Sequence, residues 1–275
     1  MKHSIITIMV TILLSEHVMA WDFTSPVGGR CSGMGYTSVA MSDFWSIHNN
    51  PAGIAEWRHI SAGFYYENRF LMKELGYKNA AFLIPLDIGV IGLSVRQFGF
   101  THYNENKIGI AFARSFGKSL RIGIQLDYLL FAFSKDYKKY HTATFEAGLS
   151  YDITEKLCVA AYLFNPVLTK IKSLNKDKLP IIMRAGLLYN LTDDFSMSTE
   201  IEEDFEANFK LRFGIEYKAY KNLYLRCGIQ SNPWIICFGT GYSFKNIAID
   251  ISSNMHCQLG VSLQSSIIFN IKSRS

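Results

Sequence analysis

The chain has 275 residues, of which 49% are hydrophobic and 14% are aromatic, and its formal net charge is +5. This length allows one or two domains, and a modest positive charge spread along the chain gives no reason to expect a nucleic-acid partner. Past the N-terminus, no stretch approaches the roughly 20 continuous apolar residues of a membrane-spanning helix. The composition therefore argues against a helical membrane protein and against a basic nucleic-acid-binding domain.

Residues 1–20 have the pattern of a secretory signal peptide. A charged start precedes an apolar run at 5–14, and small or tolerated residues precede the expected cleavage after Ala20. The next residue is Trp21 rather than a cysteine, which argues against a lipoprotein. We therefore expect an exported mature chain that begins near residue 21.

The cysteines are odd in number, so they cannot all pair within the chain, and they lack the spacing of metal ligands. We favour a structural role for them as small wall residues, and a single disulfide stays open as the alternative. The five are Cys31, Cys158, Cys227, Cys237 and Cys257.

From His59 onward, apolar and polar residues alternate with a period of two, which is typical of strands with one apolar face. Most of these segments have about ten residues, the length of a tilted strand that crosses a bilayer, whereas strands in soluble proteins usually have about 5–6. The sequence predicts about fourteen strands, near 59–67, 77–85, 88–99, 106–115, 119–133, 141–152, 156–165, 180–191, 194–203, 207–219, 222–231, 233–243, 246–253 and 257–271.

The predicted connections alternate in length. Tight turns at 85–87, 116–118, 154–155, 192–194, 220–221 and 245–246 join every second pair of strands. The intervening connections are mostly longer, at 68–76, 100–105, 134–140 and 165–179, with short ones near 204–206 and 231–232. Membrane barrels have an even number of strands, short periplasmic turns and longer outer loops. The sequence therefore predicts an all-β, transmembrane antiparallel β-barrel at 58–275, with the N-terminal segment and the C-terminus on the periplasmic side.

The charged face of these strands is predicted to line the lumen. In a membrane barrel apolar side chains meet lipid and polar ones face inward, and a secreted soluble barrel is the alternative. Glycines such as Gly123 and Gly228 share the polar face, which suits a crowded interior. The predicted lumen-facing charges are Arg96, Arg114, Arg121, Asp127, Glu146, Arg184, Glu200, Glu202, Lys210, Arg212, Glu216, Arg226 and Asp250. Aromatic residues predicted to form interfacial girdles are Tyr65, Tyr66, Tyr151, Tyr189, Tyr217, Tyr220, Trp234, Tyr242 and Phe244.

Candidate chemistry is sparse, and no motif for a hydrolase, a zinc protease, a P-loop or a dinucleotide site is present. Ser42, Asp43 and His48 are close in sequence, but proximity is not triad geometry, so we expect His48 to hydrogen-bond within a folded turn. The neighbouring acids Glu200 and Glu202 suit acid–base chemistry or a cation. Pairing with Arg184, Lys210 or Arg212 on adjacent strands is favoured instead. The sequence thus predicts no catalytic site, no cofactor and no metal.

The stretch 28–57 is the part of the exported chain that breaks the alternation. It contains GGRCSGMG at 28–35, AMSD at 40–43 and NNPAGIA at 49–55. These three runs, in this order and spacing, resemble the N-terminal signature of the FadL/PorV superfamily of outer-membrane proteins. That superfamily has fourteen-stranded barrels with an N-terminal plug in the lumen.

The resemblance implies a plug at residues 21–57, because the corresponding segment of the family folds into the barrel. By position it implies that Arg30, Gly33 and Gly35, together with Gly28, shape the start of the plug. It also places Asp43 in the acidic run that follows. Asn50, Pro51, Ala52 and Gly53 would form the turn that closes the plug before the first strand.

The functions that the resemblance implies differ between branches. FadL-type members pass hydrophobic molecules by passive diffusion, and PorV-type members, with the related PorQ group, serve type IX secretion. The expected role is therefore non-enzymatic passive transport of a small hydrophobic solute across a bacterial outer membrane. The alternative is an accessory role in secretion with exported proteins as partners, and a lipid-modifying enzyme is the third hypothesis. Outer-membrane lipid is the other expected partner, and the basic loop 165–179 would face either lipopolysaccharide or solvent.

Overall fold

The structure is a computed structural model that describes residues 24–133, 139–169, 179–204 and 209–273. The predicted signal peptide and most of the basic loop 165–179 lie outside these residues. Among the described residues, no helix is both long enough and apolar enough to cross a membrane.

Fourteen antiparallel strands form one closed barrel, in which each strand pairs with its sequence neighbours and β1 pairs with β14. The prediction of a fourteen-stranded barrel is confirmed. The strands are β1 (His59–Asn68), β2 (Gly76–Leu86), β3 (Gly89–Phe100), β4 (Tyr103–Phe116), β5 (Leu120–Phe133), β6 (Lys139–Asp152), β7 (Leu157–Phe164), β8 (Ile182–Thr192), β9 (Phe195–Asp204), β10 (Lys210–Tyr220), β11 (Leu223–Gln230), β12 (Ile235–Phe244), β13 (Ile247–His256) and β14 (Gly260–Ser273).

The two ends of the barrel differ. The hairpins of the turn end connect strands through 87–88, 117–119, 153–156, 193–194, 221–222 and 245–246. The loop end carries the longer connections, including 69–75, which contains two short 3-10 helices. The predicted longer connection at 100–105 is wrong, because β3 and β4 continue to Phe100 and from Tyr103 as a paired ladder. The last strand begins at Gly260 rather than at 257, where a turn precedes it.

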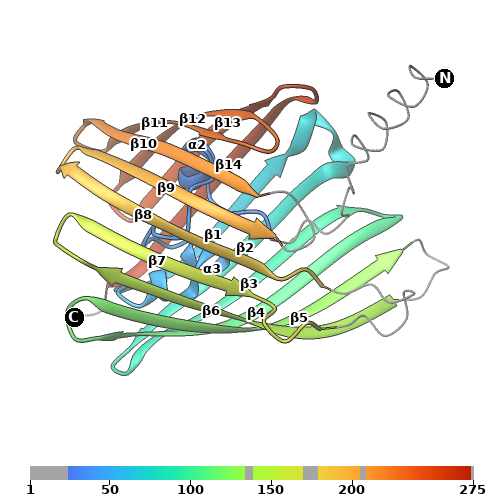
Figure 1. The fold of residues 1–275 in the computed structure, drawn as a ribbon, viewed down its shortest axis with the longest axis horizontal. Helices are drawn as coiled ribbons and strands as arrows, with labels where there is room; N and C mark the ends of the chain where they lie inside the picture. The colour runs from blue at the N-terminus through green and yellow to red at the C-terminus, as the bar shows by residue number, and fades with distance from the viewer. Residues whose placement is uncertain (1–23, 134–138, 170–178, 205–208, 274–275) are drawn as a thin grey trace, which may run out of the picture.

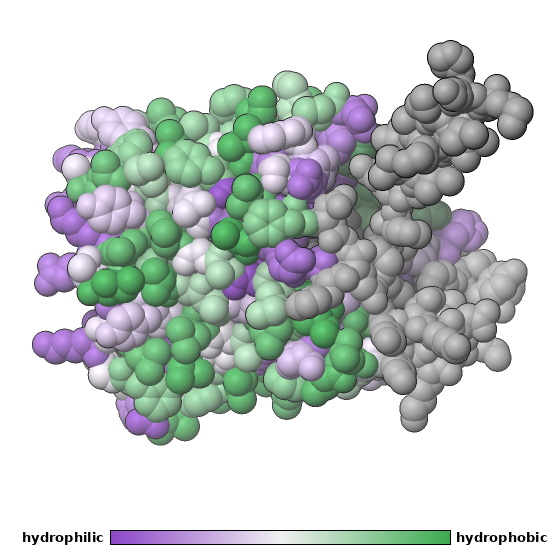
Figure 2. Space-filling view, viewed as in Figure 1, coloured by the Kyte–Doolittle hydropathy of each residue, from purple (hydrophilic) through white to green (hydrophobic). Residues whose placement is uncertain are grey.

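The outer surface of the barrel is apolar and the inner surface is polar. Ile110, Leu126 and Ile251 are more than half exposed on the outside, and Figure 2 shows a largely hydrophobic middle band with hydrophilic side chains at the turn end on the left. By contrast, charged side chains such as Glu200 and Arg212 are buried inside. This arrangement is the reverse of a soluble barrel and is that of a barrel surrounded by hydrocarbon.

Two assignments from the sequence, one outward and one inward, need correction. Tyr65 is not a girdle residue, because it is buried inside the barrel, where its hydroxyl donates to Glu67 Oε2 at 3.1 Å. Arg114 does not face the lumen, because it is exposed and is paired across the sheet with the outward-facing Ile122. An arginine is tolerated there because it lies at the end of β4, where its guanidinium reaches water. The other predicted girdle aromatics are exposed.

Candidate functional site

The lumen holds the N-terminal segment, which we define as residues 24–57. It contains the short helices α2 (Gly29–Gly33) and α3 (Ser46–Asn49) and the 3-10 helix η1 (Pro51–Ile54). Figure 1 shows this blue segment enclosed by the strands. Most of its residues are buried. The lumen with this segment is the candidate site.

The segment crosses the lumen from end to end. At the loop end, the Ser25 carbonyl accepts a hydrogen bond from Arg96 Nη2 at 2.9 Å, and the Ser25 hydroxyl accepts one from Arg69 at 3.0 Å. Arg184 donates to the Thr24 carbonyl there. At the turn end, residue 57 leads directly into β1. The prediction that the segment would lie on the side of the C-terminus is therefore wrong for its first residues.

Asparagine side chains fix the fold of the segment. The Asn49 side chain accepts a hydrogen bond from the Val27 amide at 2.8 Å and donates one to the Val27 carbonyl at 2.8 Å. Asn50 precedes η1, and its side-chain oxygen accepts from the Ala52 amide at 3.1 Å. The side-chain nitrogen of Asn50 donates to the Val39 carbonyl at 2.7 Å. Proline at the first position of η1 suits a helix start because that amide has no partner. These contacts tie three distant parts of the segment together.

The predicted motif glycines permit close backbone approach. Gly33 packs against Gly239 of β12, so an added Cβ on Gly33 would lie 2.9 Å from the Gly239 Cα. Gly35 has a φ of 67°, and an added Cβ there would lie 2.6 Å from the backbone nitrogen of Ile229. On the opposite wall, Gly123 lies against the Ala52 amide in the same way. The wall glycines Gly123 and Gly239 therefore contact the backbone of the segment directly, and we call such wall positions glycine seats.

The remaining motif residues also lie in contact with their neighbours. Gly28 has a φ of 124° and packs against Trp45, and Gly53 packs against the Met41 carbonyl and Ser46. Asp43 accepts a hydrogen bond from the Trp45 amide at 2.9 Å.

An ion-pair chain joins α2 to the wall of β10, β11 and β13. Arg30 donates to Glu216 through two nitrogens, at 3.1 and 2.7 Å, and lies 3.5 Å from Asp43. Arg226 in turn bridges Glu216 at 2.5 Å and Asp250 at 2.6 Å. Two-pronged arginine–carboxylate pairs fix orientation as well as charge, so this chain sets how α2 lies on the wall.

Glu200 holds the turn that follows α2. Its Oε2 accepts hydrogen bonds from the amides of Ser38 and Val39 at 2.6 and 2.7 Å. Its other oxygen pairs with Arg212 and lies 3.8 Å from Arg184.

Glu202, two residues along β9, completes the cluster. It pairs with Arg184 at 2.6 Å, with Lys210 at 2.8 Å and with Arg212 at 2.8 Å. The two neighbouring acids are thus fully engaged with cations. This is the pairing favoured from the sequence, and it leaves no free carboxylate for acid–base chemistry.

A second buried charge cluster lies on β4, β5 and β6. Lys107 pairs with Glu146 and lies 3.7 Å from Asp127, and all three side chains are almost fully buried. Nearer the turn end, Arg121 pairs with Asp152 and, at 3.1 Å, with Glu56 of the segment. The sequence reasoning missed Lys107, although its alternation with Ile108 on β4 would have placed it on the polar face.

His48 and Trp45 form the buried centre of the segment. Their rings stack with centroids 6.0 Å apart, and among the described residues neither the His48 ring nitrogens nor the Trp45 indole nitrogen has a hydrogen-bond partner. The expected turn hydrogen bond of His48 is made by its backbone amide, which donates to the Trp45 carbonyl at 2.9 Å, and not by its ring. Burial, followed by the positive charges of Arg96 and Lys107, holds the pKa of His48 well below its ordinary value. His48 is thus a neutral packing residue.

No catalytic arrangement forms around Ser42, Asp43 and His48. Ser42 is exposed whereas His48 is buried, and the serine that contacts the Asp43 carboxylate is Ser46, at 3.4 Å. Among the described residues, no group of histidine, cysteine and acidic side chains is arranged to hold a metal ion. The five cysteines are all unpaired.

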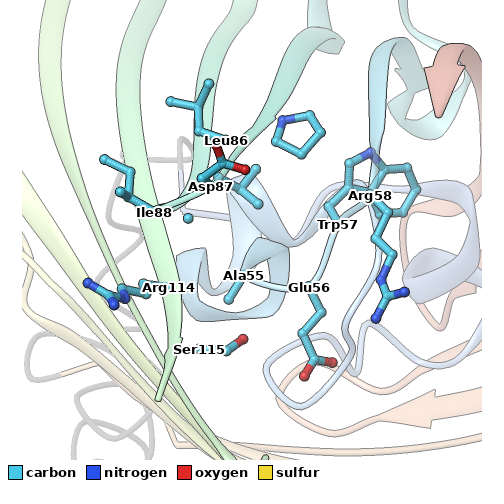
Figure 3. A pocket seen from close by; sticks show the side chains of 12 residues that line it. Ala55, Glu56, Trp57, Arg58, Leu86, Asp87, Ile88, Arg114 and Ser115 are labelled. Carbon is cyan, nitrogen blue, oxygen red and sulfur yellow. The ribbon is translucent and has the colours of Figure 1, made fainter. Parts of the chain in front are cut away.

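Pockets border the segment at both ends of the barrel, and besides the loop-end pocket and the turn-end pocket a further pocket of about 410 Å³ lies beside Arg30 and Glu216. The loop-end pocket has a volume of about 230 Å³ and is lined by Pro26 and Tyr36 of the segment and by Phe70, Ile235 and Arg69 of the wall, among others. The turn-end pocket has a volume of about 540 Å³. Figure 3 shows Ala55, Glu56 and Trp57 on one side of it and the β2–β3 hairpin on the other. Among the described residues, a pocket thus borders the segment at each end of the lumen.

Comparison of the fold with solved structures finds channel proteins. The TodX monoaromatic hydrocarbon channel of Pseudomonas putida, as its deltaS2 mutant, matches with a TM-score of 0.73 over 92% of this chain and 100% of that chain, at 11% identity. The CymD monoaromatic hydrocarbon channel matches with a TM-score of 0.70, 12% identity and coverage of 93% and 100%. A Pseudomonas aeruginosa FadL homologue matches with a TM-score of 0.65, 10% identity and coverage of 90% and 98%.

The chain therefore has the fold of these channel proteins. At the level of sequence alone, no family model and no curated protein matches the chain.

Proposed function

We propose that the chain is a bacterial outer-membrane barrel that passes a small hydrophobic solute passively, with the N-terminal segment as its plug. The proposal includes export by the signal peptide at 1–20 and a periplasmic turn end. The observation that carries it is the presence of a pocket on each side of the segment, in a barrel whose fold matches hydrocarbon channels. An apolar cavity of about 150 Å³ already binds benzene. Both pockets exceed this volume, and in both of them apolar side chains share the lining with charged ones such as Arg58 and Arg69.

Further support comes from the contacts that the segment makes with the wall of the described lumen. Buried ion pairs and glycine seats hold the segment against opposite walls. A wide water-filled pore for polar solutes is not favoured by this filling. The secretion role stays an implication of the sequence resemblance alone, and the separated Ser42 and His48 give no support to an enzyme.

Uptake of radiolabelled toluene tests the proposal. A Gram-negative host whose lipopolysaccharide leaflet slows apolar solutes is compared with and without the protein. We expect faster toluene uptake with the protein and unchanged uptake of a polar solute such as glycerol. Equal toluene uptake in both strains, with the barrel present in the outer membrane, would refute the function.

Plugging is tested separately by ion conductance in planar bilayers. Deleting residues 31–50 should raise the conductance of the barrel severalfold. Folding of the variant is checked by its heat-dependent mobility shift in electrophoresis. If the deletion does not fold, the Arg30→Met, Glu200→Gln double variant loosens the same contacts and should raise the frequency of open events. Unchanged conductance in a folded variant would contradict the plug.

A further inference from the structure

The inner wall of the barrel has two unlike regions. On β8–β11 and β13 several inward side chains are charged, and they hold the segment through Glu200, Glu216 and their partners. The inward side chains of β1–β4 carry no charge over the half nearest the turn end. That uncharged region consists of Ser61, Gly63, Ala81, Leu83, Val90, Gly92, Ala111 and Ala113.

The segment faces the uncharged region with its own apolar side chains. Together they form one buried cluster, which we call the apolar seam. From the segment it contains Val27, Phe44, Trp45, Ile47 and Ile54, and from the wall it contains Tyr65, Ala81, Leu83, Val90, Ala111, Ala113 and Ile268.

The apolar seam runs between the two pockets. At one end, Val27 of the seam follows Pro26, which lines the loop-end pocket. At the other end, Val90 belongs to both the seam and the turn-end pocket. Ala55 and Trp57 pack against the seam and also line that pocket, as Figure 3 shows. A hydrophobic molecule therefore meets apolar side chains along the seam itself, while charged residues such as Arg69 and Arg58 share the lining of the pockets at its ends.

The two sides of the segment differ in what separation would require. Moving α2 off β10–β13 would separate Arg30 from the buried Glu216, and removing one partner of a buried pair is strongly destabilising. Moving Phe44 and Ile47 away from Gly63 and Gly92 separates apolar surfaces, and a hydrophobic solute that enters the gap covers them again. The hydrogen bonds of residues 25–36 to β1 and β3 lie nearer the loop end, where Tyr36 donates to Glu67 and Arg96 donates to the Ser25 carbonyl. The solute itself thus offsets the cost of opening on the seam side only.

We infer that the solute crosses the barrel along the apolar seam, between residues 44–47 and the inner wall of β1–β4, and leaves through the turn-end pocket. Throughout the passage α2 stays bound to β11–β13. This route rests on the proposed function. Phe44, Trp45 and Ile47 are accordingly the residues that contact the solute and select for its size.

Two reversible disulfide locks test the route in a background without the five native cysteines. The seam lock is Ile47→Cys with Gly92→Cys, because Gly92 faces Ile47 so closely that an added Cβ would lie 3.3 Å from the Ile47 Cγ1. The control lock is Val39→Cys with Gly186→Cys on β8, where an added Cβ would lie 2.7 Å from the Val39 Cγ1. Mass spectrometry establishes that each disulfide has formed.

We expect the seam lock to lower toluene uptake at least tenfold, with recovery on addition of dithiothreitol, and the control lock to stay within twofold of the unlocked background. Unchanged uptake with the seam locked would overturn the route, as would equal blockage by both locks, which would mean that the whole segment moves. If the unlocked protein shows no toluene uptake at all, the proposed function fails instead.

A single substitution gives an independent readout where a lock prevents folding. In the same background, the thiol of Ile47→Cys should react several times faster with an apolar maleimide when toluene is present. The thiol of Val39→Cys should react at the same rate with and without toluene. A toluene effect that is equal at both positions, or absent at Ile47→Cys in a protein that takes up toluene, contradicts the seam route.

Discussion

Replacing Glu200 with glutamine tests how the segment is held. The change keeps the size of the side chain but removes the charge that accepts from the Ser38 and Val39 amides at 2.6 and 2.7 Å. Removing one partner of a buried ion pair typically costs about 3–5 kcal/mol. A free-energy change of about 1.4 kcal/mol corresponds to a factor of ten in an equilibrium constant. The lower figure of about 3 kcal/mol therefore makes local opening of the turn at 37–41 roughly 100-fold more frequent.

Hydrogen–deuterium exchange of a peptide covering 37–41 measures this opening directly, because those two amides exchange only when their bonds to Glu200 break. The matched control is Asp194→Asn, which removes the exposed pair between Asp194 and Lys218 at 3.8 Å. Exposed pairs contribute about 0–1 kcal/mol, so exchange at 37–41 should not change there. Equal protection in Glu200→Gln and wild type would refute the reasoning that this carboxylate anchors the segment.

Three further predictions concern the same contacts. Gly228→Leu places a side chain against the backbone of the segment, and overpacking of this kind costs about 1–3 kcal/mol. The segment should therefore become sensitive to proteolysis. Gly76→Ala should not have this effect, because the added Cβ would lie 3.3 Å from its nearest neighbour, the Lys73 carbonyl oxygen. In the folded protein the pKa of His48 is held well below its ordinary value of about 6.5. His48 therefore binds a proton more readily when the segment has left the lumen than when it is buried there. The stability due to neutral His48 is therefore complete above about pH 6.5 and is lost below it, so proteolysis of the segment should accelerate from about pH 7.5 to 5, and His48→Gln should flatten this dependence. Arg30→Gln removes two charge-assisted hydrogen bonds of about 1.5–3 kcal/mol each and should speed exchange at 28–34, whereas Lys218→Gln, whose ion pair is exposed, should leave it unchanged.

The barrel was predictable from the sequence because each strand carries its own signal. Alternation identified all fourteen strands, and it placed Glu216 and Arg226 on one face before any pairing was known. The same rule, applied strictly, would have placed Arg114 outside, since it shares the parity of Ile110. Charge alone is a poor guide at strand ends, where a long side chain reaches water from either face.

The path of the segment could not be read in the same way. Its contacts join residues far apart in the chain, such as Gly35 with Gly228 and Ser38 with Glu200, and no local pattern encodes such a pairing. The glycines on the polar faces were a usable sign of crowding, but they do not say which part of the segment rests on which glycine. The burial of Tyr65 likewise depends on the segment, because its hydroxyl lies 3.2 Å from that of Ser32.

The glycine seats have a consequence for assembly. The segment is made first and is continuous with β1, yet it rests on strands as late as β12 and β13. The ladder between β1 and β14 joins the two ends of the sheet. A sheet that closed beforehand would leave Glu216 without Arg30 and Arg121 without Glu56. The segment would then have to pass between backbones that leave no room for a methyl group. We therefore expect the sheet to assemble around the segment, with the pairing of β1 and β14 as the last event of folding.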